Sequence, residues 1–464
     1  MRLLEIVIPV LLGVYLVWPR PRLLGVRLAP ALALAATVLH LIFEGYRWQM
    51  VPLYVLTLVL AVLSLRANSK PKEGFAWGTI LASVMLVIAI ALPVVLPVPV
   101  IGAPSGPYQV GTTFFEMTDT SRSEIYSGIA GEPRRFMIQA WYPAAVTSAD
   151  VLAPWIQDAD VYTPAISTML DLPPFFLDHL ALTKTPAYVS PQIAESAGPF
   201  PLIIFSHGWK GFSAASTGQA SELASQGYVV IALQHTYGAI TTVFPDGTVA
   251  PINPKALPAE EDDPNYEVIA RRLVAQWAGD ISFVVDQLES SSGEAGSFFA
   301  GMVDLSRIGV YGHSTGGGAA IQFCGTDPRC KVVLGMDPWM RPVSAEVIAA
   351  GVRQPAFFMF SEEWAEVVGD RNKNNLLLDQ FLPNNSDSRG VVELLGTAHL
   401  DFSDLPLLSP IAPLLGLKGP LNGQRVIEIV NAYLVDFFGM TLMDRPSALF
   451  EGEFDDFVEV RVFK

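Results

Sequence analysis

Four long apolar runs lie within the first hundred residues and restrict the possible folds more than any other feature of the sequence. They cover residues 3–18, 28–43, 51–65 and 77–95. The first three are shorter than the roughly 20 residues that cross a bilayer comfortably, but aromatic or basic side chains flank every run, as they do at membrane interfaces. A cleavable signal peptide would explain the first run alone. The sequence therefore predicts a transmembrane region of about four helices in residues 1–100.

The basic residues between these runs predict how the helices are oriented. They are, in chain order, Arg20, Arg22 and Arg27 in the first connection, Arg47 in the second, and Arg66, Lys70 and Lys72 in the third. Because cytoplasmic loops are enriched in Lys and Arg, the first and third connections are expected in the cytoplasm. The rest of the chain is then expected on the extracytoplasmic side of a multi-pass cell-membrane protein. Glu5 and Glu44 are the only acids within or at the edge of a run, which favours an anchor over a transporter.

Residues 101–464 differ in composition and are expected to form one α/β domain. The first hundred residues hold eight basic and three acidic side chains, which leaves 21 basic against 42 acidic ones in the remainder, a net charge of −21. A domain that acidic repels phosphate backbones, so nucleic acid is not expected as a partner. Two cysteines in 464 residues exclude a disulfide-rich scaffold.

Short apolar strands alternate with amphipathic helices through this domain. The expected strands cover residues 136–142, 202–205, 228–233, 308–311, 332–336, 356–360 and 391–395. The clearest helix is expected over residues 266–288, where apolar side chains recur at steps of three and four. This alternation predicts a mostly parallel sheet covered by helices on both sides. An insertion over residues 152–196 is expected to be either a lid-like, acyl-binding wall near the membrane or a peripheral packing segment.

The segment Gly312-His313-Ser314-Thr315-Gly316 has the form of a nucleophile elbow. It follows the expected strand at residues 308–311 and opens a glycine-rich helix. The nucleophile of such an elbow has a strained backbone, and side chains two residues before and after it would collide, so glycine occupies both positions. The pattern predicts that Ser314 is the nucleophile of an α/β-hydrolase fold.

A serine hydroxyl is a weak nucleophile near neutral pH and needs a base, usually histidine. The chain has six histidines. His40 lies in an apolar run, His179 in the insertion, His207 and His235 after central strands, and His313 inside the elbow, with its side chain expected to point away from Ser314. His399 follows the last expected strand, and the base comes last in the chain order of α/β-hydrolases. The sequence therefore favours His399 as the base.

Two places could supply the acid that orients the histidine. Asp337 ends the strand that follows the nucleophile helix, whereas Glu362 and Glu363 lie one strand later, the commoner position in this fold. Asp337 follows a buried apolar run and precedes Pro338, which should fix its carboxylate near the carboxyl edge of the sheet. The two glutamates lie in a charged turn that is expected to be solvated. The pattern favours Asp337, with an Asp-Pro turn former as the alternative.

An oxyanion hole needs two backbone N–H groups aimed at the tetrahedral oxygen. One is expected from Thr315, directly after the nucleophile. The other is expected from Trp209, in the loop that leaves the strand at residues 202–205, where Gly208 allows the backbone to approach a substrate. His207 is expected to have a structural, hydrogen-bonding role in that loop.

Several segments together resemble the plasma and intracellular type II platelet-activating factor acetylhydrolase family of serine esterases. They are FSHGW from Phe205, GHSTGG from Gly312, GMDPWM from Gly335, GTAH from Gly396, GPYQVG from Gly106 and WYP from Trp141. The resemblance covers about residues 106–440 and none of the apolar runs. It implies a triad of Ser314, Asp337 and His399, with Trp209 and Thr315 as oxyanion donors. It also implies phospholipid substrates with short or oxidised sn-2 acyl chains, cleaved without calcium.

The sequence gives little support for a metal or cofactor site. No HExxH or paired-cysteine motif is present, so neither metal nor cofactor is expected. The acids Glu260, Glu261, Asp262 and Asp263 precede a helix and are expected to complement its dipole. Cys324 and Cys330 could pair in an oxidising compartment, but two buried thiols are the favoured interpretation.

These observations predict a membrane-anchored serine esterase or lipase. Ser314 would attack the ester of a lipid or small-molecule substrate, His399 would carry the proton, and Asp337 would orient the imidazole. Short-acyl phospholipids are the expected substrates, so the expected role is lipid degradation. Two alternatives remain: a catalytically silent scaffold or receptor on a hydrolase fold, and an acyltransferase that uses the same triad.

Overall fold

A computed structural model describes residues 1–19, 22–66, 77–194, 198–258, 263–365, 370–450 and 457–463. Several residues singled out above lie outside this described part of the chain. They are Arg20, Lys70 and Lys72 of the predicted cytoplasmic connections, the acids Glu260 to Asp262, and the last two residues of the predicted insertion.

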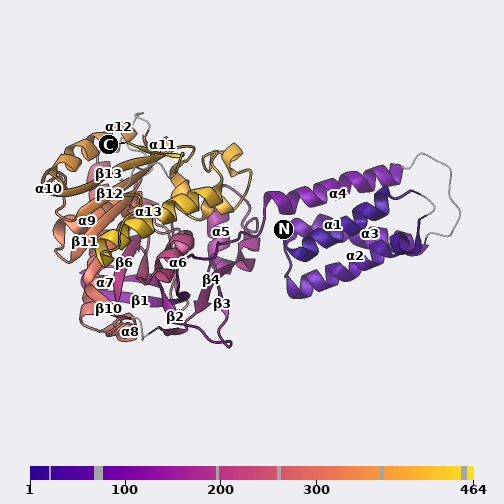
Figure 1. Cartoon of the computed structure of the whole chain (residues 1–464), viewed down its shortest axis with the longest axis horizontal. Helices are drawn as coiled ribbons and strands as arrows, with labels where there is room; N and C mark the ends of the chain where they lie inside the picture. Colours follow the sequence, from indigo (N-terminus) through magenta and orange to yellow (C-terminus); the bar gives the residue numbers. More distant parts are fainter. Residues whose placement is uncertain are drawn as a thin grey trace.

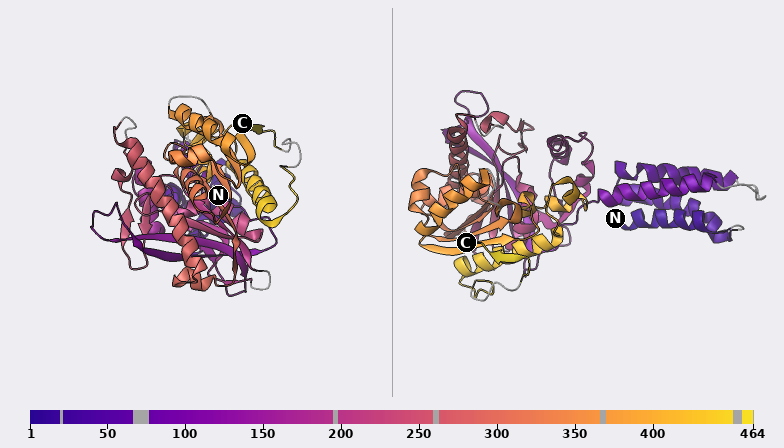
Figure 2. Two further views of the ribbon diagram at one scale, coloured as in Figure 1. Left: turned by 90° about the vertical axis from the view of Figure 1, so that its left-hand side faces the viewer. Right: turned by 90° about the horizontal axis from the view of Figure 1, so that it is seen from above.

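Each of the four apolar runs forms a helix. The helices are α1 (Leu3–Val17), α2 (Leu24–Phe43), α3 (Val51–Arg66) and α4 (Trp77–Val95), with a 3₁₀ turn η1 (Trp48–Met50) before α3. They form a bundle that projects from the rest of the molecule (Figure 1; Figure 2). A small apolar core lies between them, yet large apolar side chains such as Leu3 and Phe43 point outward and are 73% and 77% exposed. An outer surface of this kind suits lipid better than water.

The length of these helices differs from one to the next. α2, α3 with its 3₁₀ turn, and α4 are long and apolar enough to cross a membrane, whereas α1 has 15 residues. At 1.5 Å per residue, α1 is roughly 22 Å long, shorter than the hydrocarbon core of a bilayer. A fourth helix that meets the criteria of length and composition, α13 (Gly423–Met443), packs against the sheet through Ile429, Tyr433 and neighbouring side chains.

Buried ion pairs link the helices of the bundle to one another at the end of the bundle that lies next to the α/β part. The Glu5 carboxylate accepts hydrogen bonds from Arg2 and from Arg47, each at 2.8 Å, and the second Arg47 nitrogen donates to the Leu96 carbonyl at 2.7 Å. His40 lies between Glu44 and Tyr54, at 2.8 and 2.7 Å. The acids found in the apolar runs are therefore paired with neighbouring side chains.

Beyond residue 100, the chain forms a sheet of 12 strands within the described residues, in the order β14-β13-β12-β11-β10-β6-β7-β2-β1-β4-β3, with β5 beside β2. Its strands are β1 (Gln109–Ser123), β2 (Pro133–Ala145), β3 (Leu152–Pro154), β4 (Lys184–Val189), β5 (Gln192–Ile193), β6 (Phe200–Ser206), β7 (Val229–Gln234), β10 (Val303–His313), β11 (Cys330–Met336), β12 (Pro355–Ser361), β13 (Asp387–Leu394) and β14 (Val460–Val462). A separate hairpin pairs β8 (Thr241–Val243) with β9 (Val249–Pro251). Strands β7, β6, β10, β11, β12 and β13 run parallel, as predicted, while β1, β2 and β14 pair antiparallel with a neighbour.

Helices cover both faces of this sheet. The remaining α-helices are α5 (Ala159–Met169), α6 (Thr217–Ser225), α7 (Tyr266–Glu289), α8 (Gly293–Phe298), α9 (Thr315–Thr326), α10 (Ala345–Ala350), α11 (Glu362–Ala365) and α12 (Asp370–Phe381). One core joins the sheet to α7, α9 and α10, and the other joins it to α6 and α13. Because strand side chains alternate, Ile204 and Ile231 enter the first core while Ile203 and Val230 enter the second.

The predicted insertion contains strands as well as helix. Strands β4 and β3 extend the sheet beyond β1, β5 pairs with the end of β2, and α5 and the 3₁₀ turn η2 (Asp178–Leu182) lie between β3 and β4. Phe212 and Ala214 of the loop after β6 pack against this segment, and the Trp155 indole donates to the Ala214 carbonyl at 2.8 Å. The segment therefore sits over the loop that follows β6.

Candidate active site

Ser314 lies at the turn between β10 and α9 with a backbone strained as the elbow motif requires. Its φ is 55° and its ψ is −121°, a conformation that residues other than glycine rarely adopt. A Cβ on Gly312 would collide with the Gly316 carbonyl, and one on Gly316 would collide with the Ser206 carbonyl of β6. The Ser314 N–H donates to the Met336 carbonyl at 3.0 Å, which ties the elbow to the end of β11.

Asp337 follows β11 and is completely buried. The Ser361 backbone N–H donates to Asp337 Oδ1 at 2.8 Å, and the Ser361 hydroxyl donates to Oδ2 at 2.6 Å. The same Oδ2 lies 2.9 Å from His399 Nδ1. Burial raises the pKa of Asp337 to about 7, against the opposing effect of the Ser361 hydrogen bonds and of nearby His313.

His399 begins the 3₁₀ turn η7 (His399–Phe402) after β13, and aromatic rings confine its imidazole. It stacks on Trp364, with ring centroids 4.3 Å apart and planes at 18°, and the His313 ring lies 4.4 Å away. The His313 side chain therefore lies against the His399 imidazole. An imidazole held in this way keeps its Nδ1 toward Asp337, which fixes the orientation of the ring.

Glu362 and Glu363, the alternative acids, bind the backbone of the histidine loop. Glu362 Oε2 accepts from the Gly396 N–H at 2.7 Å, and Glu363 Oε2 accepts from the His399 N–H at 3.0 Å. The structure thus brings Asp337 to the imidazole and places the glutamates at the loop that carries it. Neither Ser361 nor Trp364 was singled out from the sequence; the signal that could have found them is their place at the end of β12 and in the turn of helix that follows it.

Ser314 and His399 line one apolar cavity of about 470 Å³, together with Trp209. This volume lies within the roughly 300–1,000 Å³ of small-molecule sites. The Trp209 N–H makes no hydrogen bond within the described part of the chain. Thr315 is the first residue of α9, where backbone N–H groups and the helix dipole favour negative charge.

His207 fixes the peptide that carries the Trp209 N–H. His207 Nε2 accepts from the His235 N–H at 3.2 Å, so the ring proton is on Nδ1, which donates to the Gly208 carbonyl at 2.7 Å. Burial lowers the pKa of His207 to about 3, so the ring is neutral. Because the C=O and N–H of a trans peptide point in opposite directions, holding the Gly208 carbonyl also sets the direction of the Trp209 N–H.

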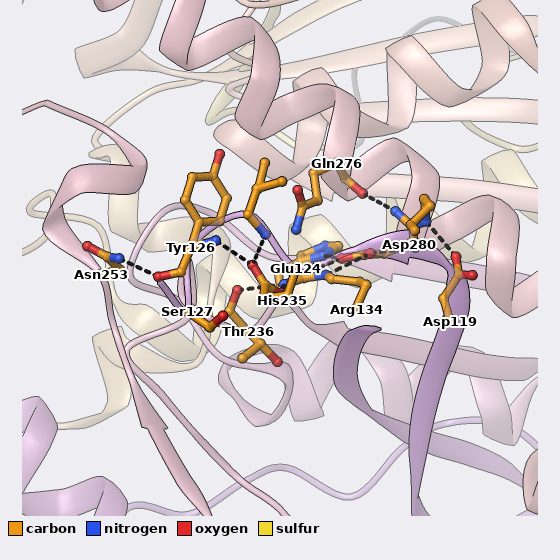
Figure 3. Close-up of polar contacts among 12 residues, drawn as sticks. Asp119, Glu124, Tyr126, Ser127, Arg134, His235, Thr236, Asn253, Gln276 and Asp280 are labelled. Carbon is orange, nitrogen blue, oxygen red and sulfur yellow. Dashed lines mark hydrogen bonds and ion pairs between the residues drawn. The ribbon is translucent and has the colours of Figure 1, made fainter. Parts of the chain in front are cut away.

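A second hydrogen-bonded series of serine, histidine and aspartate lies in the core. The Ser206 hydroxyl and Asp280 Oδ2 each lie 2.9 Å from a nitrogen of His235, which stacks on Trp277. Arg134 reaches both Asp280 and Glu124 (Figure 3). All of these side chains are buried, and none of them lines the cavity at Ser314. This network therefore supports the fold. The sequence signal that could have revealed this network is Asp280, an acidic residue on the apolar face of α7.

Two clusters of described residues have the composition of a metal site. One is His313, Asp337 and His399, and the other is Glu5, His40 and Glu44. The hydrogen bonds given above already engage Asp337 and His399, and two arginines contact the Glu5 carboxylate. Both clusters are therefore explained by partners within the protein.

The two cysteines correct one prediction. Cys324 of α9 and Cys330 of β11 form a disulfide, with Cα atoms 5.1 Å apart, and are not the two buried thiols expected from the sequence. Their separation of six residues allows a short turn between helix and strand that brings the sulfurs together.

Comparison with known proteins gives a consistent family assignment. The family model described as "Platelet-activating factor acetylhydrolase, isoform II" matches residues 98–445. Proteins named platelet-activating factor acetylhydrolase from Cavia porcellus and Gallus gallus are 26% and 25% identical to this chain; the alignments cover 76% and 71% of it, and 82% and 81% of those proteins. A "Probable 1-alkyl-2-acetylglycerophosphocholine esterase" from Arthroderma benhamiae is 22% identical, over 82% of this chain and 98% of its own length.

The fold also matches a solved structure. A ferulic acid esterase from Streptomyces cinnamoneus superposes with a TM-score of 0.65 at 24% sequence identity. The match covers 79% of this chain and 100% of that one. It confirms the predicted α/β-hydrolase fold.

Proposed function

Because the chain belongs to the platelet-activating factor acetylhydrolase isoform II family and is a carboxylic ester hydrolase, we propose that it cleaves phospholipid esters at Ser314 from a membrane anchor. Residues 1–100 are the anchor in this proposal, and residues 101–464 are the hydrolase domain. Short-acyl phospholipids are the proposed substrates, in line with the names of the relatives from Cavia porcellus and Arthroderma benhamiae.

In the proposed reaction, Ser314 Oγ attacks the ester carbonyl carbon while its proton passes to His399 Nε2. Asp337 accepts the hydrogen bond from Nδ1 and stabilises the imidazolium that forms. The Trp209 and Thr315 N–H groups stabilise the negative charge on the carbonyl oxygen. The carbon–oxygen bond to the alcohol then breaks, and His399 returns the proton to the leaving oxygen.

Water completes the cycle. His399 removes a proton from water, the hydroxide adds to the acyl-enzyme carbonyl, and the bond to Ser314 Oγ breaks as the proton returns to it. The products are a carboxylic acid and the free enzyme, without a metal or cofactor.

One observation carries this proposal: a strained, cavity-lining Ser314 shares its cavity with an imidazole that is hydrogen-bonded to a buried carboxylate. The distance of 2.9 Å between His399 Nδ1 and Asp337 Oδ2 joins side chains 62 positions apart. A structural salt bridge would not require the nucleophile backbone to be strained, nor an apolar cavity at the same place.

The test is covalent labelling of the full-length protein in detergent with a fluorophosphonate, followed by mass spectrometry. We expect the label on Ser314, no label on Ser314→Ala, and a loss of phospholipid hydrolysis of about 10⁴-fold or more in that variant. Full labelling of Ser314→Ala would contradict the assignment. An excess of chelator in a parallel assay should leave hydrolysis unchanged.

The same assay separates the two alternatives. A silent scaffold would take no label and release no acid. An acyltransferase would form a new ester when glycerol is supplied, at the expense of free acid, whereas the hydrolase proposed here releases mainly acid in water.

A further inference from the structure

The cavity at Ser314 is bounded in part by the N-terminal helices. Trp48 of η1, Leu92 and Val95 of the last turn of α4, and Leu96 directly after it line the cavity together with the nucleophile. The family model begins at residue 98, so these four side chains lie outside the matched region. The helical region therefore does more than hold the hydrolase domain near a membrane.

The opposite walls of the cavity are apolar as well. They come from the insertion, through Ile166, Met169, Leu170, Leu172, Phe176 and Leu177, and from residues 405–417. In the second of these walls the polar lining side chain is Ser409, whose hydroxyl donates to the Val95 carbonyl at 2.6 Å. An acetyl ester alone would leave most of this apolar space unfilled, which disfavours a site built only for small esters.

Specific contacts hold the helices against these walls. The Trp48 indole donates to the Phe176 carbonyl at 3.0 Å and its ring packs against Phe175 and Phe176. The Gln49 amide donates to His179 Nδ1 at 2.8 Å. With the Arg47 bond to the Leu96 carbonyl, these contacts fix η1 and the end of α4 to the insertion.

Exposed apolar side chains line the cavity or adjoin its lining residues in the sequence. Leu415 and Met169 line the cavity and are 62% and 36% exposed. Leu414 precedes Leu415, and Phe175 precedes the lining residue Phe176; these two side chains are 85% and 52% exposed. Exposed apolar groups beside an apolar cavity suit contact with a bilayer better than contact with water. Because Trp48 and Leu92 also line this cavity, it adjoins the helical bundle, which projects from the α/β part (Figure 2).

We propose that α4 and η1 form one wall of the substrate site, and that the hydrocarbon chain of a membrane lipid ester lies between this wall and the insertion while its ester reaches Ser314. The proposal rests on the proposed function of Ser314 and adds residues that determine its specificity. The long hydrocarbon chain of the substrate can belong to its acyl group or to its alcohol. The experiments below test these two possibilities separately.

A photoreactive probe tests the position of the chain directly. A fluorophosphonate with a long alkyl chain that carries a diazirine would label Ser314 in the full-length protein, and light would then link the chain to its neighbours. We expect cross-links to peptides that contain Trp48 or residues 92–96. Labelling of Ser314 with cross-links confined to other parts of the chain would overturn this inference, whereas absence of labelling would count against the function of Ser314 itself.

Substitutions test the effect on specificity. Leu92→Trp fills the cavity from α4, and Val94→Trp is the matched control, since Val94 is exposed on the same helix and does not line the cavity. Two substrate pairs are compared: p-nitrophenyl laurate with the acetate, and 1-hexadecyl with 1-butyl 2-acetylglycerophosphocholine. We expect Leu92→Trp to lower the ratio of long-chain to short-chain kcat/KM in at least one pair by about tenfold or more, the worth of burying roughly two methylene groups.

The control variant should keep the ratios of the unsubstituted protein. Unchanged ratios for Leu92→Trp in both pairs would overturn the inference. If Leu92→Trp fails to fold, as judged by loss of fluorophosphonate labelling, Leu172→Trp fills the same cavity from the insertion and is read by the same ratios.

Discussion

Two features of the surroundings of Asp337 act in opposite directions on the charge of its carboxyl group. Burial opposes ionisation, while the Ser361 hydroxyl and N–H, at 2.6 and 2.8 Å, stabilise the charged form. Ser361 touches neither the cavity nor the reacting atoms, so it acts by positioning Asp337. The balance between these effects sets the pH at which the Asp337–His399 pair becomes protonated.

Replacing Ser361 with alanine should therefore shift the pH profile. Without the hydroxyl, the ionised Asp337 is less stable, its pKa rises further, and the acidic limb of kcat/KM moves to higher pH. Because one charge-assisted hydrogen bond is worth about 1.5–3 kcal/mol, the limb should move by roughly one pH unit or more. Steady-state hydrolysis of a soluble ester between pH 5 and 9 measures this shift.

Ser361→Thr keeps a hydroxyl, so the acidic limb of its kcat/KM profile should lie at the pH found for the unsubstituted protein. If Ser361 had only a structural role, the position of this limb would not depend on the hydroxyl. A limb that stays in place in Ser361→Ala, with lower activity at every pH, would contradict the role of Ser361 in setting the charge of Asp337.

The side chains expected to form the triad could be chosen from the sequence because each lies where a parallel strand ends. Ser314, Asp337 and His399 follow β10, β11 and β13, and the carboxyl ends of parallel strands meet at one edge of the sheet. The residues that hold them could not be chosen in this way. Trp364 stacks on His399 only because α11 folds back after β12, and no periodicity in the sequence reports such a return.

At the scale of elements, α7 is joined to the sheet by charge as well as by apolar packing. Asp280 of α7 accepts from Arg134 of β2 at 2.7 Å and from His235 after β7 at 2.9 Å (Figure 3). All three side chains are completely buried. Arg134 and His235 keep the pKa of Asp280 well below its usual range despite burial, so the carboxylate is charged.

Asp280→Asn should destabilise the protein strongly, because among the described residues it leaves the buried Arg134 charge with Glu124 as its one remaining acidic partner. Breaking a buried pair in this way costs about 3–5 kcal/mol of unfolding free energy. The measurement is the urea midpoint of the detergent-solubilised protein, followed by tryptophan fluorescence.

Asp246→Asn is the control, since Asp246 forms an exposed pair with Arg135 and its loss should leave the midpoint nearly unchanged. Equal midpoints for the two variants would show that the Asp280 network contributes nothing specific to stability.

The elements that the sequence predicted well carry a strong, regular pattern. The helix expected over residues 266–288 is α7 (Tyr266–Glu289), because its apolar face repeats over six turns. The strand β1 was missed, since exposed and buried side chains alternate along it with many polar residues, a weaker signal than a continuous apolar run. In the insertion, β3, β4 and β5 are short and depend on pairing with other strands of the sheet, which is a tertiary interaction.

At the scale of the whole molecule, the orientation of the proposed membrane anchor would decide where the hydrolase domain works. The chain starts next to the α/β part, and α4 ends there (Figure 1). The connection between α2 and η1 carries Arg47, but this side chain is buried and paired with Glu5 at 2.8 Å, so it adds no free positive charge to that end of the bundle. Arg22 and Arg27 lie at the opposite end of the bundle, close to the start of α2.

This distribution predicts an extracytoplasmic hydrolase domain, since positive charge is retained in the cytoplasm. The disulfide between Cys324 and Cys330 favours the same side, because such bonds persist in oxidising compartments. Alkaline phosphatase, which is active only after export, should be active when fused after residue 464 and inactive when fused within residues 67–76. The reverse pattern would place the hydrolase domain in the cytoplasm, and the substrate would then have to come from the inner leaflet.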